Sequence, residues 1–440
     1  MNKIKKRLAM VIALLSAVGI STAQSGAKFS MTIDDCLNYA KENSIVLKQY
    51  ALDIDDRIAD ELSAKGAFLP NLSGYVGENL SSNPAAQIGS NGVSFSGNYA
   101  LDLSLDIYSG GANRATLQQS KLNKQIATLS LAEQENSIEV AVTEVFVQIL
   151  YAMEQIEVSK QSLMVSEKAL ERGAAMYEVG SINKADYSLL ESARATDLYD
   201  IVVAETTLSN LYVSLKQLLE ISADVEISVI APNINEISMM SVVPQVAEVY
   251  DIALKTRPEI TSSVLSIETA KYDEKIARSG YLPSLTLSAG VGNGHLNNTY
   301  ALNTQMRENF STNVGVGLSV PIFNNYKTKT SVQKARNSVT SAELTLTDRQ
   351  KYLYQTIEQL HNNTKTAMAL YTVSDYKLKA VETSLELTFQ QYEVGMKNIV
   401  ELLIDQDSRR DAAQEFLINK YQLLYNRAIL EFYRTDIIKL

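Results

Sequence analysis

Four long tracts of this chain contain neither proline nor glycine, and they restrict the fold more than any other feature of the sequence. Leu, Ala, Glu, Gln and Lys are frequent in them, and these residues have high helix propensity. At a rise of 1.5 Å per residue, roughly 60 to 70 helical residues make a rod of about 100 Å, far longer than the usual three turns. The tracts are 112–172, 181–231, 325–394 and 396–440.

The apolar residues in two of these tracts follow the spacing of a coiled coil. They step alternately by four and three residues, which winds helices into a left-handed supercoil. An isolated long coiled coil would show the same period, so the spacing alone leaves that fold open. The positions are Ile138, Val142, Val145, Ile149, Ala152 and Ile156, followed by Leu417, Tyr421, Leu424 and Ala428.

Between the helical tracts the hydrophobic period changes to two, which is typical of strands. The alternating segments are 72–80, 93–107, 285–292 and 310–320. They predict two hairpins, about 71–108 and 284–323, joined by polar loops near 82–91 and 295–308. Strands of about 10 to 15 residues are long enough to cross a membrane at a tilt.

The sequence also contains an internal duplication. The matching segments are 68–72 with 281–285, 103–108 with 318–323, and 177–180 with 392–395. Three matches in the same order at nearly one offset indicate two tandem repeats. We expect a single unit, 24–440, made of repeats at about 31–231 and 244–440.

The residue pattern in each repeat predicts a short helix, a second helix, two strands, a very long helix, a turn and another long helix. The long helices cover about 111–222 and 325–438. Tyr177 and Gly180 in the first repeat, and Gly395 in the second, mark the point where the long helix reverses. Glycine fits there because it can take the positive φ that ends a helix.

The first 23 residues are typical of a secretory signal peptide. Basic residues from Lys3 to Arg7 precede an apolar run from Leu8 to Ile20, and Ala23 provides a small residue for cleavage. The apolar run is about 13 residues, shorter than the roughly 20 that a membrane-spanning helix needs. We therefore expect an exported protein without a membrane-spanning helix.

Charge and histidine content argue against several function classes. Without the four basic residues of the signal peptide, 36 Lys and Arg face 50 Asp and Glu, so the formal charge moves from -10 to about -14. Such acidity disfavours a nucleic-acid partner. The two histidines, His295 and His361, are far apart and suggest neither a metal site nor a nucleophile with its base. We expect no enzyme, no metal and no cofactor.

Four amphipathic strands cannot close a membrane barrel, because the smallest barrels have eight strands and open edges in hydrocarbon leave backbone groups unpaired. The chain must therefore assemble with copies of itself. A trimer gives twelve strands, and a dimer or a tetramer satisfies the same arithmetic. The expected fold class is an α+β membrane protein, in which a long α-helical coiled-coil barrel continues a transmembrane β-barrel with four strands per chain.

Features spread over essentially the whole mature chain resemble the TolC-type outer-membrane efflux protein family. They are the signal peptide, the duplicated hairpins, the strand end Leu-Ser-Val-Pro-Ile-Phe at 318–323, and the repeated turns followed by Leu189-Leu190 and Leu402-Leu403. The resemblance implies a homotrimer, whose barrel lies in outer-membrane lipid and whose tunnel extends into the periplasm. It also implies a passive exit duct for tripartite efflux or type I secretion, with a periplasmic adaptor (membrane-fusion) protein and an inner-membrane pump of RND or ABC type as partners.

The resemblance further implies a periplasmic mouth that is closed by helices after the two turns. Carried over by position, its links join Asp186 of the first repeat to Tyr392 and Lys397 of the second. Lysine at the last position gives a point-charge contact where arginine would offer a bidentate fork.

The constriction of the mouth, on the same resemblance, is acidic. It maps to Glu401, while the position one turn on is Ile404, with Asp405 beside it. Three copies of a carboxylate on one axis would repel each other and attract cations. The plainer alternative is that Glu401 and Asp405 are solvated charges near the start of a helix.

A second function class stays open from the residues alone, a non-catalytic periplasmic coiled-coil scaffold or adaptor without a membrane barrel. Such a protein would remain soluble after membrane fractionation, whereas the duct would not.

Overall fold

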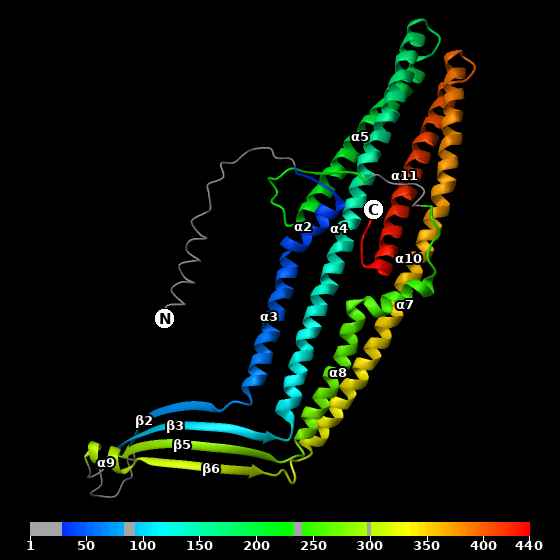
Figure 1. The fold of residues 1–440 in the computed structure, drawn as a ribbon. Helices are drawn as coiled ribbons and strands as arrows, with labels where there is room; N and C mark the ends of the chain where they lie inside the picture. Colours follow the sequence, from blue (N-terminus) through cyan, green and yellow to red (C-terminus); the bar gives the residue numbers. More distant parts are fainter. Residues whose placement is uncertain (1–28, 83–92, 233–239, 297–300) are drawn as a thin grey trace.

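The computed structural model describes residues 29–82, 93–232, 240–296 and 301–440, so the predicted signal peptide and most of the first predicted loop lie outside the described residues. The chain is elongated, with a sheet at one end and two long helical hairpins at the other (Figure 1).

The elements of the first half are β1 (Phe29–Met31), α2 (Ile33–Asn43), α3 (Ile45–Gly66), β2 (Asn71–Ser82), β3 (Val93–Ser109), α4 (Ala112–Glu178), α5 (Lys184–Leu218) and β4 (Ile227–Val229). Those of the second half are α7 (Val246–Thr256), α8 (Pro258–Ser279), β5 (Ser284–Leu296), α9 (Leu302–Glu308), β6 (Ser311–Ser319), α10 (Lys327–Glu393) and α11 (Ile399–Thr435). The same order of two helices, two strands and two long helices occurs twice, with α9 added in the second half.

The four long strands form one antiparallel sheet in the order β2-β3-β5-β6, which confirms four strands per chain. Pairing of β3 with β5 joins the two hairpins, from Ser96 opposite Leu296 to Ser109 opposite Ser284. Among the described strands, β2 and β6 each have one neighbour, so both outer edges of the sheet are open.

The register separates apolar from polar side chains onto the two faces of the sheet. Leu103, for example, lies between Leu72 and Ala289, whereas Asp102 next to it pairs with Gly290 on the other face. Partners in an antiparallel ladder share one face, and successive residues alternate between faces. One face is therefore rich in Leu and Val, and the other in Ser, Asn, Asp and Gly.

Two features of the sheet differ from the predicted pattern. A β-bulge between Asp106 and Tyr108 puts Tyr108 beside Leu285, in the place that strict alternation assigns to Ile107. An inserted residue moves every following side chain to the opposite face, which a period-two pattern cannot anticipate.

The second difference is α9, which forms within the loop predicted near 295–308. Its Gln305 Oε1 accepts from the Leu296 N–H at 2.8 Å, and the Asn309 side chain donates to the Gly294 carbonyl at 2.6 Å. A helix of 7 residues is too short to show a helical period, so the sequence carried no signal for it.

The long helices form two antiparallel pairs, which we call the first coil (α4 and α5) and the second coil (α10 and α11). α4 and α10 have 67 residues each, and contacts between α4 and α11 hold the coils side by side (Figure 1). Nearer the sheet, α3 packs on α4, and α8 packs between α4 and α10. The long helices together with α3 and α8 therefore form a single layer, with α3 and α5 along one edge and α10 along the other.

The main core lies midway along the helices, where α2 and β4 pack on α4 and β1 pairs with β4. Val142 and Ile149 of the predicted coiled-coil seam are fully buried there, together with Phe146. Burial of each such side chain contributes about 1.5–3 kcal/mol. Within the described ranges, no helix is both long enough and apolar enough to cross a membrane.

Candidate functional site

The candidate site lies at the two turns that reverse the long helices, at the end of the molecule farthest from the sheet (Figure 1). The turns span 179–183 and 394–398, between the helices of the first coil and of the second coil. Gly180 has a φ of 74° and Gly395 a φ of 76°. This left-handed conformation ends a helix and favours glycine, which explains the glycine that closes each Tyr-Glu-Val-Gly sequence.

Both turns share the hydrogen bonds that define one helix-ending motif. The N–H of the residue after each glycine donates to the carbonyl five residues earlier, at 2.8 Å in both cases, which is a Schellman motif. Asn183 then caps α5 and Asn398 caps α11, each accepting from the N–H three residues later at 2.9 Å. Local sequence thus specifies both the end of one helix and the start of the next.

Asp186 and Glu401 provide those capped N–H groups and so occupy equivalent positions. The Glu401 side chain also accepts from the Asn398 N–H, through Oε2 at 3.0 Å, which completes a capping box. In α5 the Asp186 N–H donates to the Asn183 side chain, but within the described chain no bond from the Asn183 N–H to the Asp186 carboxylate is found. One carboxylate oxygen of the predicted constriction acid is therefore engaged at the start of its own helix.

Tyr392 joins the two coils near the turns. It is 2% exposed and belongs to an apolar cluster with Ala169 and Leu190 of the first coil and Ile399 and Leu402 of the second. Its hydroxyl has no hydrogen-bond partner among the described residues. A buried unpaired hydroxyl costs roughly 1–3 kcal/mol, which marks this position as one where a further contact is expected.

Two charges of the first coil act on the Tyr392 hydroxyl. Burial raises its pKa, the Arg172 guanidinium lowers it, and the Asp186 carboxylate raises it further. The structure therefore brings Asp186 and Tyr392 into the same region, as carried over by position. Arg172 was not among the predicted residues, yet its Nη2 donates to the Glu393 carbonyl at 2.9 Å and ties the ends of α4 and α10 together.

Lys397 lies in the second turn and makes its contact within its own coil. Its Nζ donates to Thr388 Oγ1 at 3.0 Å, and Thr388 Oγ1 donates to Asp405 Oδ2 at 2.5 Å. Among the described hydrogen bonds and ion pairs, none joins Lys397 to Asp186. Asp405, the second candidate constriction acid, is held by Thr388 and by Ser384 Oγ at 3.4 Å.

The tyrosine of the first turn has different surroundings from its counterpart in the second. Tyr177 is 41% exposed and stacks on Tyr187, with ring centres 5.3 Å apart. Behind it, Gly173 lets Leu190 approach so closely that an added Cβ would lie 2.1 Å from Leu190 Cδ1. The first coil is therefore tightly packed next to its turn.

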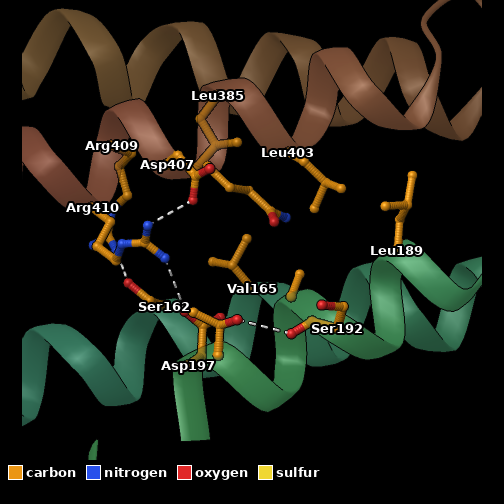
Figure 2. Close-up of a pocket in the computed structure, with 13 residues that line it drawn as sticks. Ser162, Val165, Leu189, Ser192, Asp197, Leu385, Leu403, Asp407, Arg409 and Arg410 are labelled. Atoms are coloured by element: carbon orange, nitrogen blue, oxygen red, sulfur yellow. Dashed lines mark hydrogen bonds and ion pairs between the residues drawn. The ribbon is translucent and has the colours of Figure 1, made fainter. Parts of the chain in front are cut away.

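A cavity of about 250 Å³ separates the two coils on the sheet side of the turns (Figure 2). Arg409 of α11 crosses to α4, where its Nη2 donates to Gln161 Oε1 at 2.9 Å. Arg410 Nη2 pairs with Asp407 at 2.8 Å, and Nη1 lies 3.8 Å from Asp197 of α5. The cavity between the coils is therefore bordered by polar contacts that join α11 to both helices of the first coil.

Asp197 is the buried carboxylate of this cavity, at 7% exposure. Burial raises its pKa, while a hydrogen bond from Ser166 and the charge of Arg410 lower it. Sequence analysis did not single out Arg172, Asp197 or Thr388, because each is an ordinary polar residue within a long helix, and only the packing of helices distant in sequence brings its partners near.

Comparisons with known proteins agree with a fold of two strand hairpins and two long helical coils. The family model described as outer membrane efflux protein matches residues 36–219 and 249–433. Outer membrane protein TolC of Vibrio cholerae is 22% identical over 86% of this chain and 85% of its own length. The alkaline protease secretion protein AprF of Pseudomonas aeruginosa is 22% identical over 71% of this chain and 66% of its own.

Among solved structures, the CmeC outer membrane channel of Campylobacter jejuni superposes with a TM-score of 0.78 at 16% identity, covering 94% of this chain and 90% of CmeC. At this identity the likeness shows a common fold.

Proposed function

This chain belongs to the outer membrane efflux protein family, and from that premise we propose that three copies form a passive exit duct through the periplasm and the outer membrane. Members of the family are outer-membrane channels and not enzymes. In the trimer, twelve strands would close a barrel in outer-membrane lipid, and the coils would form the tunnel.

The observation that carries this proposal is the pair of complementary open edges on one protomer. β2 is an open sheet edge and continues from α3, whereas β6 is the other open edge and leads into α10. Unpaired strand edges in hydrocarbon are costly, and joining β6 of one copy to β2 of the next removes all of them in a closed ring. A head-to-tail contact of this kind closes into a ring when the rotation between copies allows it.

The helical layer has matching apolar edges. On α3, Leu52 and Leu62 are 63% and 70% exposed, and on α10 Leu344 and Val373 are 65% and 63% exposed. Because α3 and α10 lie on opposite edges of the layer, neighbouring copies would cover both sets at once. Large exposed apolar side chains on both edges agree with contacts between neighbouring copies.

The sheet supports the outer membrane as the location. Leu72, Val76, Val314 and Leu318 on its apolar face are each more than half exposed in the single chain. A lipid-facing apolar surface with a polar interior is what a membrane barrel requires. The alternative of a periplasmic scaffold or adaptor without a barrel leaves this face unexplained.

The partners we propose are a periplasmic adaptor protein and an inner-membrane pump of RND or ABC type, which would supply the energy. The name of AprF refers to protease secretion, and the match to CmeC concerns an outer-membrane channel, so both secretion and efflux agree with the relatives. We further propose that the two repeats, 31–231 and 244–440, each contribute one hairpin to the barrel and one coil to the tunnel.

At the turns we propose the periplasmic mouth, with Asp186, Tyr392 and Lys397 among the residues that hold it closed. The unpaired Tyr392 hydroxyl close to Asp186 supports this assignment. Glu401 remains the candidate constriction acid, although its engagement in the capping box leaves only part of the carboxylate for the lumen.

The test uses the full-length protein purified from outer membranes in detergent. Wild type should migrate as a trimer, and Asp186→Ala should increase single-channel conductance in planar bilayers, because one charge that faces Tyr392 is lost. Glu205→Ala, an exposed carboxylate on the same helix, is the matched control. Recovery of a soluble monomer would refute the duct, and equal conductance of Asp186→Ala and wild type would refute the mouth assignment.

A further inference from the structure

The hydroxyl of Thr388 is shared by a cation and an anion from different segments of the second coil. Thr388 lies on α10, Lys397 in the turn and Asp405 on α11. The hydroxyl accepts from Lys397 at 3.0 Å and donates to Asp405 at 2.5 Å, and Thr388 is 2% exposed. A threonine hydroxyl has one proton and two lone pairs, so it can make both bonds at once.

The equivalent positions of the first coil form a contact of another kind. The shift of 215 residues that places Tyr177 on Tyr392 places Gly173 on Thr388, Ile182 on Lys397 and Leu190 on Asp405.

These first-coil residues also meet. A Cβ added to Gly173 would lie 2.1 Å from Leu190 Cδ1 and 3.8 Å from Ile182 Cδ1. The same three positions therefore tie the turn to both of its helices in each coil, through apolar packing in the first and through charge-assisted hydrogen bonds in the second.

We propose that Thr388 is a positioning residue of the mouth, and that Lys397 acts there through the Thr388 hydroxyl. This inference rests on the proposed function of the turns as the mouth of a duct. Thr388 holds the ammonium group against the end of α10 and holds the Asp405 carboxylate on the coil. The turn 394–398 thereby moves together with α10 and α11.

The chemistry of the contact favours this role over simple packing. Hydrogen bonds with an ionised donor or acceptor are roughly twice as strong as neutral ones. Thr388 makes one bond with an ionised donor, Lys397, and one with an ionised acceptor, Asp405. Without the hydroxyl, Lys397 and Asp405 would lose their common partner, and the flexible lysine side chain would no longer have one defined position. Such an ionic tie also weakens when either charge is removed, whereas the apolar tie of the first coil does not.

A double-mutant cycle in planar bilayers tests the proposal. The variants are Lys397→Met, Thr388→Val and the double variant. Each single variant is expected to raise the conductance of the closed mouth about twofold. This factor corresponds to the lower end of the interaction energies between residues of one hydrogen-bond network. The double variant is expected to match the larger single effect, because both substitutions break the same tie.

Two further variants separate positioning from folding. Thr388→Ser retains the hydroxyl and should restore wild-type conductance. Thr364→Val removes a hydroxyl that is equally buried on α10 but bonds only its own helix, at the Leu360 carbonyl, and should leave conductance unchanged. Trimer recovery and thermal unfolding of every variant show that the protein has folded.

The outcomes distinguish this inference from the function on which it rests. If the effects of Lys397→Met and Thr388→Val multiply, Lys397 acts independently of Thr388 and the inference is wrong. If Lys397→Met raises conductance while Thr388→Val does not, the inference is wrong and the mouth assignment stands. If Asp186→Ala leaves the conductance at the wild-type value, the mouth assignment itself fails, and the inference with it.

Discussion

Gly173 allows a direct test of how tightly the first coil is packed next to its turn. In Gly173→Ala the new Cβ would lie 2.1 Å from Leu190 Cδ1. Carbon atoms in good contact are about 3.5–4.0 Å apart, so Leu190 or the helix itself must move by roughly 1.4 Å. Leu190 is 1% exposed, so its side chain can turn away only if its buried neighbours also move.

The net effect is the sum of two opposing contributions. Alanine in place of glycine favours a helix by about 1 kcal/mol. Overpacking of a closed contact costs about 1–3 kcal/mol. We therefore expect Gly173→Ala to lower the free energy of unfolding by about 1 kcal/mol, the difference between 2 and 1.

The assay is thermal unfolding followed by the helical circular dichroism of the protein in detergent. The control is Gly66→Ala at the end of α3, where an added Cβ meets nothing within 4 Å, so this variant should be slightly stabilised. Adding Leu190→Ala to Gly173→Ala should cost less than the sum of the single effects, because the new methyl group fills part of the space. An equal rise in melting temperature for Gly173→Ala and Gly66→Ala would show that the close contact does not exist.

Two further predictions concern the carboxylates. Glu401→Gln keeps a side-chain oxygen for the capping box but removes the charge, so cation selectivity measured from reversal potentials should fall while the melting temperature stays the same; an unchanged reversal potential would exclude a charged ring. Asp197→Asn tests the pKa of a buried acid. Because burial raises the pKa of Asp197, the native protein binds the proton more readily than the unfolded chain does. This contribution to stability is fully present below the unfolded pKa of 3.8 and is lost as the pH rises through the folded pKa. Asp197→Asn should therefore melt higher than wild type at neutral pH and no higher at about pH 4, and a lower melting temperature at neutral pH would contradict the argument.

Much of the fold could be predicted from the sequence, because the signals are local. The positive φ of Gly180 and Gly395 follows from a glycine placed at the end of a long helical tract. Alternation from Val93 onward places a strand whichever partner it pairs with. Such patterns failed where an insertion or a short helix interrupts them, as at the Asp106–Tyr108 bulge and at α9.

The candidate site could be predicted only in part. The resemblance to the family, carried over by position, pointed to Asp186 and Tyr392, and the structure brings them into one region. The same resemblance links Lys397 to Asp186, and that link stays a prediction; within the described chain the Lys397 Nζ donates to Thr388. Arg172 was missed, because its partner is a backbone carbonyl of α10, and no pattern of side chains in the sequence predicts such a contact.

The sequence by itself determined where the long helices reverse, which four segments form the long strands and that the unit is repeated, because these depend on backbone preferences and on periods within one segment. Only the tertiary structure decided that β3 pairs with β5, that Tyr392 is buried between the coils, and that one triad of repeated positions is apolar while the other is ionic. Those features depend on which helix faces which, and contacts between residues far apart in the chain leave no trace in the period of either segment.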